Sequence, residues 1–272
     1  MKYLPPCVAV LLIIASAKTF AGTTPPIDSI IQKVLLTHQT AMAELSDLTL
    51  DIDSYERRLD GDGNVKETAK LVKKGHLKRV EGGKFLYCED YNEYYINGER
   101  QDQKSLKKIT KERLNRKKKS RSKDLSFDIT TPLEPQFREI YDIVDQGLSE
   151  KEIEGYPCFL LSATVNDNNT AGKIMDTLAN YLFYIDTLSY QIVKVDFEPA
   201  RLISKLFFKF KLLKMSISFA PYDSALWLPS HFHIDGRAKA AFFVGVNFEG
   251  EEFFKNPVIN SGLDDSLFKS GH

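Results

Sequence analysis

The chain has 272 residues, of which 43% are hydrophobic, and it carries 37 basic and 37 acidic side chains. This length suits one large domain or two small ones. Because the charges balance, the protein as a whole has no strong positive potential that would attract a polyanion. We therefore expect no nucleic-acid partner.

The first residues have the pattern of a secretory signal peptide. Lys2 supplies a positive start, Val8 to Ala17 is an unbroken small-to-apolar run, and Thr19 to Ala21 ends in small residues suited to cleavage. The run is too short to cross a bilayer core of about 30 Å, which leaves an uncleaved anchor as the weaker alternative. We therefore predict a signal peptide over residues 1–21, a single domain over residues 22–272, and a periplasmic location.

Two cysteines, Cys88 and Cys158, remain in the predicted mature chain. An exported protein can form a disulfide, but two buried thiols without a bond are an equal alternative. The sequence leaves both open.

The segment from Asp28 to Leu45 is the one strongly helical stretch. Its apolar residues recur at three- and four-residue spacing, which predicts an amphipathic helix with one broad aliphatic face. From Leu48 onward the period changes to two, and residues 48–59 and 67–80 are predicted as the first two strands.

The sequence RRLDGDGNVKET, Arg57 to Thr68, separates these two strands and has the composition of a calcium loop. An EF-hand loop starting at Asp60 would need Gly at its sixth position and Glu at its twelfth, where Val65 and Leu71 stand. Asp-Gly and Gly-Asn are turn dipeptides, so we predict a hairpin tip and no metal.

Most of the remaining chain alternates with period two. Further strands are predicted over residues 85–88, 93–96, 140–144, 158–165, 181–185, 192–197, 206–218, 231–235, 240–246 and 248–254. No regular helices lie between them, which favours antiparallel pairing, and a sheet this long tends to curl. The predicted fold class is α+β: a curved antiparallel β-sheet, an unclosed half-barrel, with the amphipathic N-terminal helix packed on the concave face.

One basic segment, Lys104 to Lys123, interrupts the strand pattern. It contains a single acid, Glu112, and only Leu106, Ile109 and Leu114 as apolar positions. We predict a solvated basic helix or a mobile excursion. The functional alternative is transient contact with an anionic membrane surface, to which each Lys or Arg contributes about 1 kcal/mol.

The sequence SHFHIDG offers the only metal-like motif. On a strand, His231, His233 and Asp235 point to one face, and two imidazoles with a carboxylate can hold a metal. Metallohydrolases with such a motif have a further histidine directly after the aspartate, where this chain has Gly236. A solvated sheet face explains the pattern better, and we predict no metal, no cofactor and no catalytic residues.

Aromatic residues crowd the C-terminal half of the chain. Any one of them is by default an ordinary core residue. Some strands, however, carry large apolar side chains on both faces, which indicates that both faces are covered or that one of them lines a hydrophobic pocket. By pattern alone, the residues predicted to line such a hydrophobic cavity are Ile31, Leu35, Phe183, Phe207 and Trp227.

Four pieces follow the signal peptide and the first helix in a recognisable order: KKGHLKRVEGGKFLY, EGYPCFLLSATV, FYIDTLSYQIVKVDF and WLPSHFHIDGRAKAAFFVGVNFE. In this order they resemble the LolA/LolB-like superfamily of periplasmic outer-membrane lipoprotein-sorting and carrier proteins. The resemblance implies an unclosed antiparallel barrel capped by helices, a cavity for acyl chains, and no enzymatic activity. In the carriers, an arginine in a KRP segment helps to control opening; the nearest match here is Lys78-Arg79-Val80, which makes Arg79 the candidate gating residue.

These observations predict a non-enzymatic periplasmic lipid- or lipoprotein-binding protein of carrier type, whose partner is a lipid or a lipoprotein acyl chain. Two alternatives remain. One is a cell-envelope sensor or protein-interaction module on the same scaffold, and the other is a metal-dependent hydrolase that uses the histidine strand.

Overall fold

The computed structural model describes residues 25–81, 83–120, 129–166, 178–201, 204–205, 208–240 and 244–269. The predicted signal peptide, Phe207 and the last residues of the basic segment lie outside this part of the chain. The elements in chain order are α1 (Ile27–Glu44), β1 (Asp47–Leu59), β2 (Val65–Arg79), β3 (Phe85–Ile96), β4 (Glu99–Arg100), α2 (Gln103–Ser120), two short 3-10 turns (Thr131–Leu133 and Pro135–Phe137), β5 (Tyr141–Leu148), β6 (Cys158–Val165), β7 (Ala179–Asp186), β8 (Ile192–Pro199), β9 (Ser204–Lys205), β10 (Phe208–Pro221), β11 (Trp227–Ala240), β12 (Val244–Ile259) and α3 (Ser266–Lys269).

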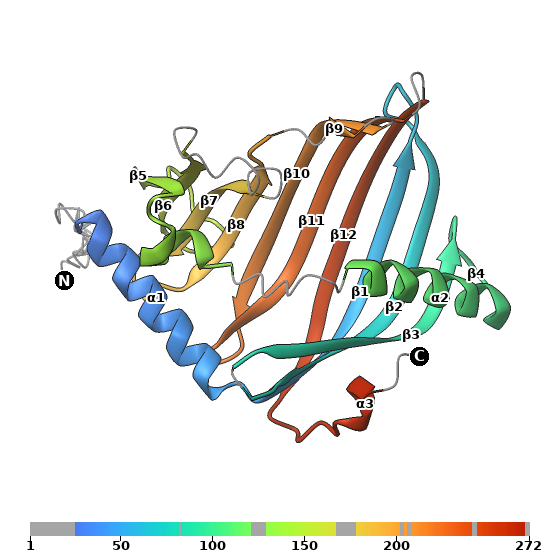
Figure 1. The fold of residues 1–272 in the computed structure, drawn as a ribbon, viewed down its shortest axis with the longest axis horizontal. Coiled ribbons are helices and arrows are strands. Elements are labelled where there is room, and N and C mark those ends of the chain that lie inside the picture. Colours follow the sequence, from blue (N-terminus) through green and yellow to red (C-terminus); the bar gives the residue numbers. More distant parts are fainter. Residues whose placement is uncertain are drawn as a thin grey trace, which may run out of the picture.

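The strands form one antiparallel sheet (Figure 1). Their order is β4-β3-β2-β1-β12-β11-β10-β8-β7-β6-β5, with β9 paired to β10. Within the described residues β4 and β5 are the two edges and do not pair with each other, so the sheet stays unclosed. The α+β half-barrel predicted from the sequence is confirmed.

Helix α1 starts after Pro26, whose fixed φ suits a helix start, and it packs across one side of the sheet. Ile30, Ile31 and Val34 are buried in a cluster with the strands from β5 to β8. About two turns further along, Ala41 belongs to a second buried cluster, together with Leu48, Leu50 and Ile52 of β1. The helix therefore ties the two halves of the sheet together on one face. No helix among the described residues combines the length and apolarity needed to cross a membrane.

The first hairpin has the tip that its turn dipeptides predict. Asp60 Oδ1 accepts hydrogen bonds from the backbone N–H groups of Asp62 (2.9 Å) and Asn64 (2.8 Å), and Gly63 has a φ of 90° that glycine adopts without strain. The aspartate of the supposed calcium loop thus closes a turn between β1 and β2.

Glycines on the concave face make room for the curl of the sheet. Gly236 of β11 stands opposite Phe248 of β12, and a Cβ built on Gly236 would lie 2.2 Å from the Phe248 ring. Next to this pair, a Cβ on Gly250 would lie 2.8 Å from Ile234. The missing side chains let neighbouring strands approach on the inside of the bend.

Two sequence expectations need correction. The strands predicted at residues 85–88 and 93–96 are one strand, β3, because the polar Glu89 and Asp90 stay within the ladder with β2. The strand predicted at residues 240–246 does not exist as one unit, since Ala240 ends β11 and Val244 begins β12. Cys88 on β3 and Cys158 on β6 lie near opposite edges of the sheet and are not joined by a disulfide, which answers the question that the sequence left open.

We expect Gly236→Ala to lower the free energy of unfolding by about 1 to 3 kcal/mol, because the new methyl group would force the Phe248 ring out of its place. Gly245→Ala is the matched control on the partner strand, where a Cβ would meet no atom within 4 Å. Urea unfolding of both variants checks this; equal stabilities would contradict the role assigned to Gly236.

Candidate functional site

One row of directly paired residues crosses the sheet on the face that carries both helices. It contains Leu161, Phe183, Val195, Ile217, Phe232, Glu252, Ser54, Leu71 and Tyr94, in the spatial order from β6 to β3. Side chains of paired antiparallel residues point to the same face, so this central row shares one surface. It changes from apolar to polar between Phe232 and Glu252.

The central row is covered unevenly. At one end Leu161, Phe183 and Val195 are fully buried in the cluster that α1 closes. In the middle, Ile217 of β10 and Phe232 of β11 are only half-buried. The adjacent row repeats the pattern, since Met215 and Ile234 face each other there and are half-buried too. The middle of this face is therefore an apolar surface that remains partly accessible.

At the polar end of the row lies a cavity of about 550 Å³ between α2 and the strands β12, β1, β2 and β3. This volume falls within the range of about 300 to 1,000 Å³ that is usual for small-molecule sites. Its walls are formed by Ser54, Glu56, Arg58, Glu67, Ala69, Leu71, Lys73, Tyr87, Glu89, Tyr91, Tyr94, Ile109, Glu112, Arg113 and Glu252.

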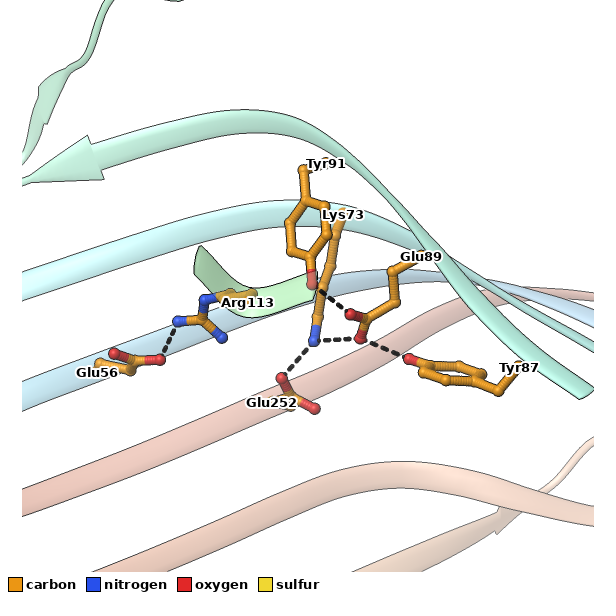
Figure 2. A network of polar contacts seen from close by, with 7 residues as sticks. All are labelled: Glu56, Lys73, Tyr87, Glu89, Tyr91, Arg113 and Glu252. Carbon is orange, nitrogen blue, oxygen red and sulfur yellow. Dashed lines mark hydrogen bonds and ion pairs between the residues drawn. The ribbon is translucent and has the colours of Figure 1, made fainter. Parts of the chain in front are cut away.

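Lys73 is the centre of a polar network in this cavity (Figure 2). Its ammonium donates to Glu89 Oε1 at 2.8 Å and to Glu252 Oε1 at 2.6 Å, and its side chain is only 5% exposed. The hydroxyls of Tyr87 and Tyr91 donate to the two oxygens of Glu89, each at 2.6 Å. A buried charge is tolerated only with such pairing, so these side chains hold one another in place.

In this network the pKa values of Lys73, Tyr87 and Tyr91 are all raised, away from neutral pH. Burial alone would lower the pKa of Lys73, but the charges of Glu252 and Glu89 outweigh it and raise the pKa. Burial, together with Glu89, raises the pKa values of Tyr87 and Tyr91 as well. An acid–base catalyst needs a pKa near the working pH, and none of these three shifts is toward neutral pH.

Helix α2 forms the outer wall of the cavity. Leu106 is buried, Ile109 and Arg113 line the cavity, and the Arg113 guanidinium donates to the Glu56 carboxylate of β1 (Figure 2). The basic segment is thus helical up to Ser120 and has an inner face that contacts the sheet. Its lysines from 104 to 111 are exposed on the other side.

The residues predicted from the pattern to line a hydrophobic cavity are, where described, not among those that line the cavity under α2. Ile31 and Phe183 are fully buried in the cluster under α1, and Leu35 packs against that cluster. Trp227 is half-buried at the start of β11, with its ring 4.9 Å from that of Tyr156. Phe207 lies outside the described residues. Ligand contact by any of them stays a prediction.

Arg79, the candidate gating residue, lies at the end of β2 beside the C-terminus of α1. Its Nη1 donates to the carbonyl of Ala43 at 3.3 Å, and its backbone N–H donates to Ser46 at 2.8 Å. A positive side chain at a helix C-terminus is favourable because it meets the negative end of the helix dipole. Arg79 therefore holds α1 in its observed place, while control of opening stays a prediction.

The histidine strand does not assemble the metal triad that its spacing allowed. His231 and His233 lie on the other face of β11 and flank Glu251, with nitrogen–oxygen distances of 3.7 and 3.8 Å. Over the part of the chain that the structure describes, no three His, Cys, Asp or Glu side chains are arranged to hold a metal. Asp235 lies further along the strand, opposite Glu249.

Sequence reasoning missed the Lys73 network. Its members come from β2, β3 and β12 and meet only through the strand register. The one signal in the sequence was Lys73 itself, which occupies a position that alternation with Leu71 assigns to the buried face of its strand.

No protein family and no curated protein matches this chain. Among solved structures it is similar to a DUF1329 family protein from Desulfovibrio piger, at 13% identity over 90% of this chain and 98% of that chain, with a TM-score of 0.47. It is also similar to a putative outer membrane lipoprotein-sorting protein domain from Vibrio parahaemolyticus, at 13% identity over 88% and 97%, with a TM-score of 0.45. A third is the lipoprotein LppX from Mycobacterium tuberculosis, at 7% identity over 87% and 97%, with a TM-score of 0.30.

The lipoprotein-sorting class that the sequence resembles thus recurs among these structures. At these identities and TM-scores the likeness carries no functional conclusion, and the proposals below rest on the residues of this chain.

We expect Lys73→Met to cost about 3 to 5 kcal/mol of stability, because Glu89 would remain buried without its cation. Lys74→Met is the matched control: the next residue forms an exposed pair with Asp51 at 3.6 Å, which contributes less than about 1 kcal/mol. Chemical unfolding at neutral pH separates the two. A small loss in Lys73→Met would show that the network does not stabilise the fold.

The raised pKa of Lys73 also predicts how the stability difference between the wild type and Lys73→Met depends on pH. Because the pKa of folded Lys73 is raised, its contribution is complete below the ordinary lysine pKa and is lost as the pH rises through the folded value. The stability gap between the wild type and Lys73→Met should persist from neutral to mildly alkaline pH. Unfolding curves that converge already at neutral pH would contradict the raised pKa.

Proposed function

We propose that this chain is a non-enzymatic periplasmic protein of carrier type, which binds a lipid or a lipoprotein acyl chain on the concave face of its open sheet. The observation that carries this proposal is the half-buried apolar surface between the two helices, formed by Met215, Ile217, Phe232 and Ile234. An acyl chain laid there would remove these side chains from water.

The energetic argument is the ordinary hydrophobic one. Each methylene buried from water contributes about 0.8 kcal/mol, so a chain of several methylenes is held without specific contacts. An apolar surface on the inside of a curved sheet offers such burial along a line, which suits a flexible chain.

The two helices differ in how firmly they cover this face. The inner side of α1 is fully buried, at Ile30, Ile31 and Val34, so moving it would expose much apolar area. In the described part of α2, by contrast, Leu106 is the buried apolar side chain, and the Arg113–Glu56 pair adds a polar contact to the sheet. We infer that α2 is the helix that moves when a ligand enters.

A membrane partner fits the outer side of α2. Lys104, Lys107, Lys108 and Lys111 are exposed there, and basic side chains near an anionic lipid surface contribute about 1 kcal/mol each. Contact through the basic segment, Lys104 to Lys123, would bring the concave face close to the lipids that it receives or delivers.

An envelope sensor or interaction module is the second candidate. The edge strand β5 favours it, because Val144 and Leu148 are exposed at 50% and 58% and an open strand edge can accept a partner strand. Capture of one protein partner at the β5 edge, without any lipid on the concave face, would favour this candidate.

The Phe232→Ala variant tests the carrier proposal. Calorimetric titration with dodecyl maltoside, below its critical micelle concentration, should show binding to the wild type and about tenfold weaker binding to Phe232→Ala. Phe253→Ala is the matched control, since Phe253 is a half-buried aromatic residue on the opposite face, stacked on His231 at 4.7 Å. An equal loss in both variants, or no binding to the wild type, would contradict the proposal.

A further inference from the structure

The cavity under α2 has an excess of negative charge. Five of its lining residues are glutamates, and three are Lys or Arg. Lys73 is shared between two carboxylates, Glu89 and Glu252, so one negative charge of that group remains uncompensated. Glu112 on α2 lines the same cavity and is exposed.

The donors of the cavity are mostly used within the protein. Lys73 commits two of its three N–H bonds, and the hydroxyls of Tyr87 and Tyr91 both point to Glu89. The guanidinium of Arg113 donates to Glu56 (Figure 2). A ligand that enters the cavity therefore meets the negative charges that these pairs leave over, those of Glu112 and of one of the two carboxylates that share Lys73.

Glu252 is the acceptor best placed for such a ligand. Only its Oε1 binds Lys73, and among the described residues its Oε2 has no hydrogen-bond partner. Its side chain is 27% exposed, whereas that of Glu89 is 5% exposed. Three tyrosines, Tyr87, Tyr91 and Tyr94, also line the cavity, and tyrosine rings attract ammonium groups.

The polar cavity and the apolar surface are adjacent. Phe232 and Glu252 are directly paired neighbours in the central row, which places their Cβ atoms about 5 Å apart. One molecule can thus occupy both regions if it has an apolar chain and a polar end.

We infer that the cavity under α2 takes the ammonium end of an amphiphile whose apolar chain lies along Phe232 and Ile217. This assignment rests on the proposed function and adds the headgroup chemistry to it. The carboxylates of Glu252 and Glu112 attract the ammonium group, and the same charges repel a phosphate or sulfate that carries no ammonium group. The ammonium group can belong to a lipid headgroup or to a free amine, which the test below separates.

The test uses three amphiphiles with the same dodecyl chain and different ends: dodecylammonium, dodecyl maltoside and dodecyl sulfate. Titrations at neutral pH, below each critical micelle concentration, should give the tightest binding for the ammonium compound, by about tenfold over the sulfate. Butylammonium, an amine with only a short chain, should bind at least about tenfold more weakly than the dodecyl compound.

Three variants test which carboxylates cause the preference for the ammonium compound. Glu252→Gln keeps the shape and removes the charge, and it should reduce the preference for the ammonium compound about fivefold. Glu112→Gln, at an exposed position, should act in the same direction without affecting folding. Glu251→Gln is the control, because the neighbouring side chain points to the opposite face, toward His231 and His233, and should leave the preference unchanged. Thermal unfolding verifies that each variant is folded.

The outcomes separate this inference from the proposed function. Equal affinity for all three dodecyl compounds would overturn the ammonium assignment and leave acyl-chain binding intact. If none of them binds, both the ammonium assignment and the proposed function are contradicted. Butylammonium that binds as tightly as its dodecyl counterpart would overturn the assignment as well, because the cavity would then be a site for a free amine.

Discussion

The register of the antiparallel ladder is the constraint on which this structure depends. It places every second side chain of the neighbouring strands on one continuous concave surface, and the two long helices, α1 and α2, each cover part of it. The first helix closes the end of the central row around Phe183, and the second encloses the end around Glu252. Between them, Ile217 and Phe232 remain half-buried, which is the physical origin of the proposed lipid surface.

At the polar end of the row, ion pairs take the place of apolar packing. A buried ion network is weak support for stability, since the cost of removing charges from water offsets much of their attraction. Lys73, with Glu89 and Glu252, occupies positions that apolar residues could fill. Removing one member is nevertheless costly, because a partner's charge would remain buried and unpaired, so the network fixes the arrangement of these side chains in the cavity under α2.

The sequence predicted the elements well where local periodicity decides them. The residues of β6 coincide with the predicted strand at 158–165, and α1 differs from its prediction by one residue at each end. Both follow from unbroken patterns of one period, and the hairpin tip at Asp60 follows from its turn residues. The order of elements also led to the half-barrel, because strands without helical crossovers must pair as neighbours.

The site could not be predicted in the same way. Glu56, Lys73, Glu89 and Glu252 are far apart in the sequence and meet only when the register of four strands is known. The predicted lining residues were chosen for hydrophobicity, and that criterion selected Ile31 of α1 and Phe183 of β7, which are fully buried in the cluster between this helix and the sheet. The contact face of α2 was not recognised in the sequence because lysines dominate the segment, although Leu106 and Ile109 have the spacing of a helix face.

The central claim is that this chain carries an amphiphile on its concave face, and native mass spectrometry of the protein extracted gently from the cells that produce it tests it most directly. We predict a species heavier than the protein chain by one lipid or acyl-bearing molecule, lost in the Phe232→Ala variant and retained in Phe253→Ala. A bare chain mass in the wild type, after extraction that preserves lipid complexes of other proteins, would contradict it.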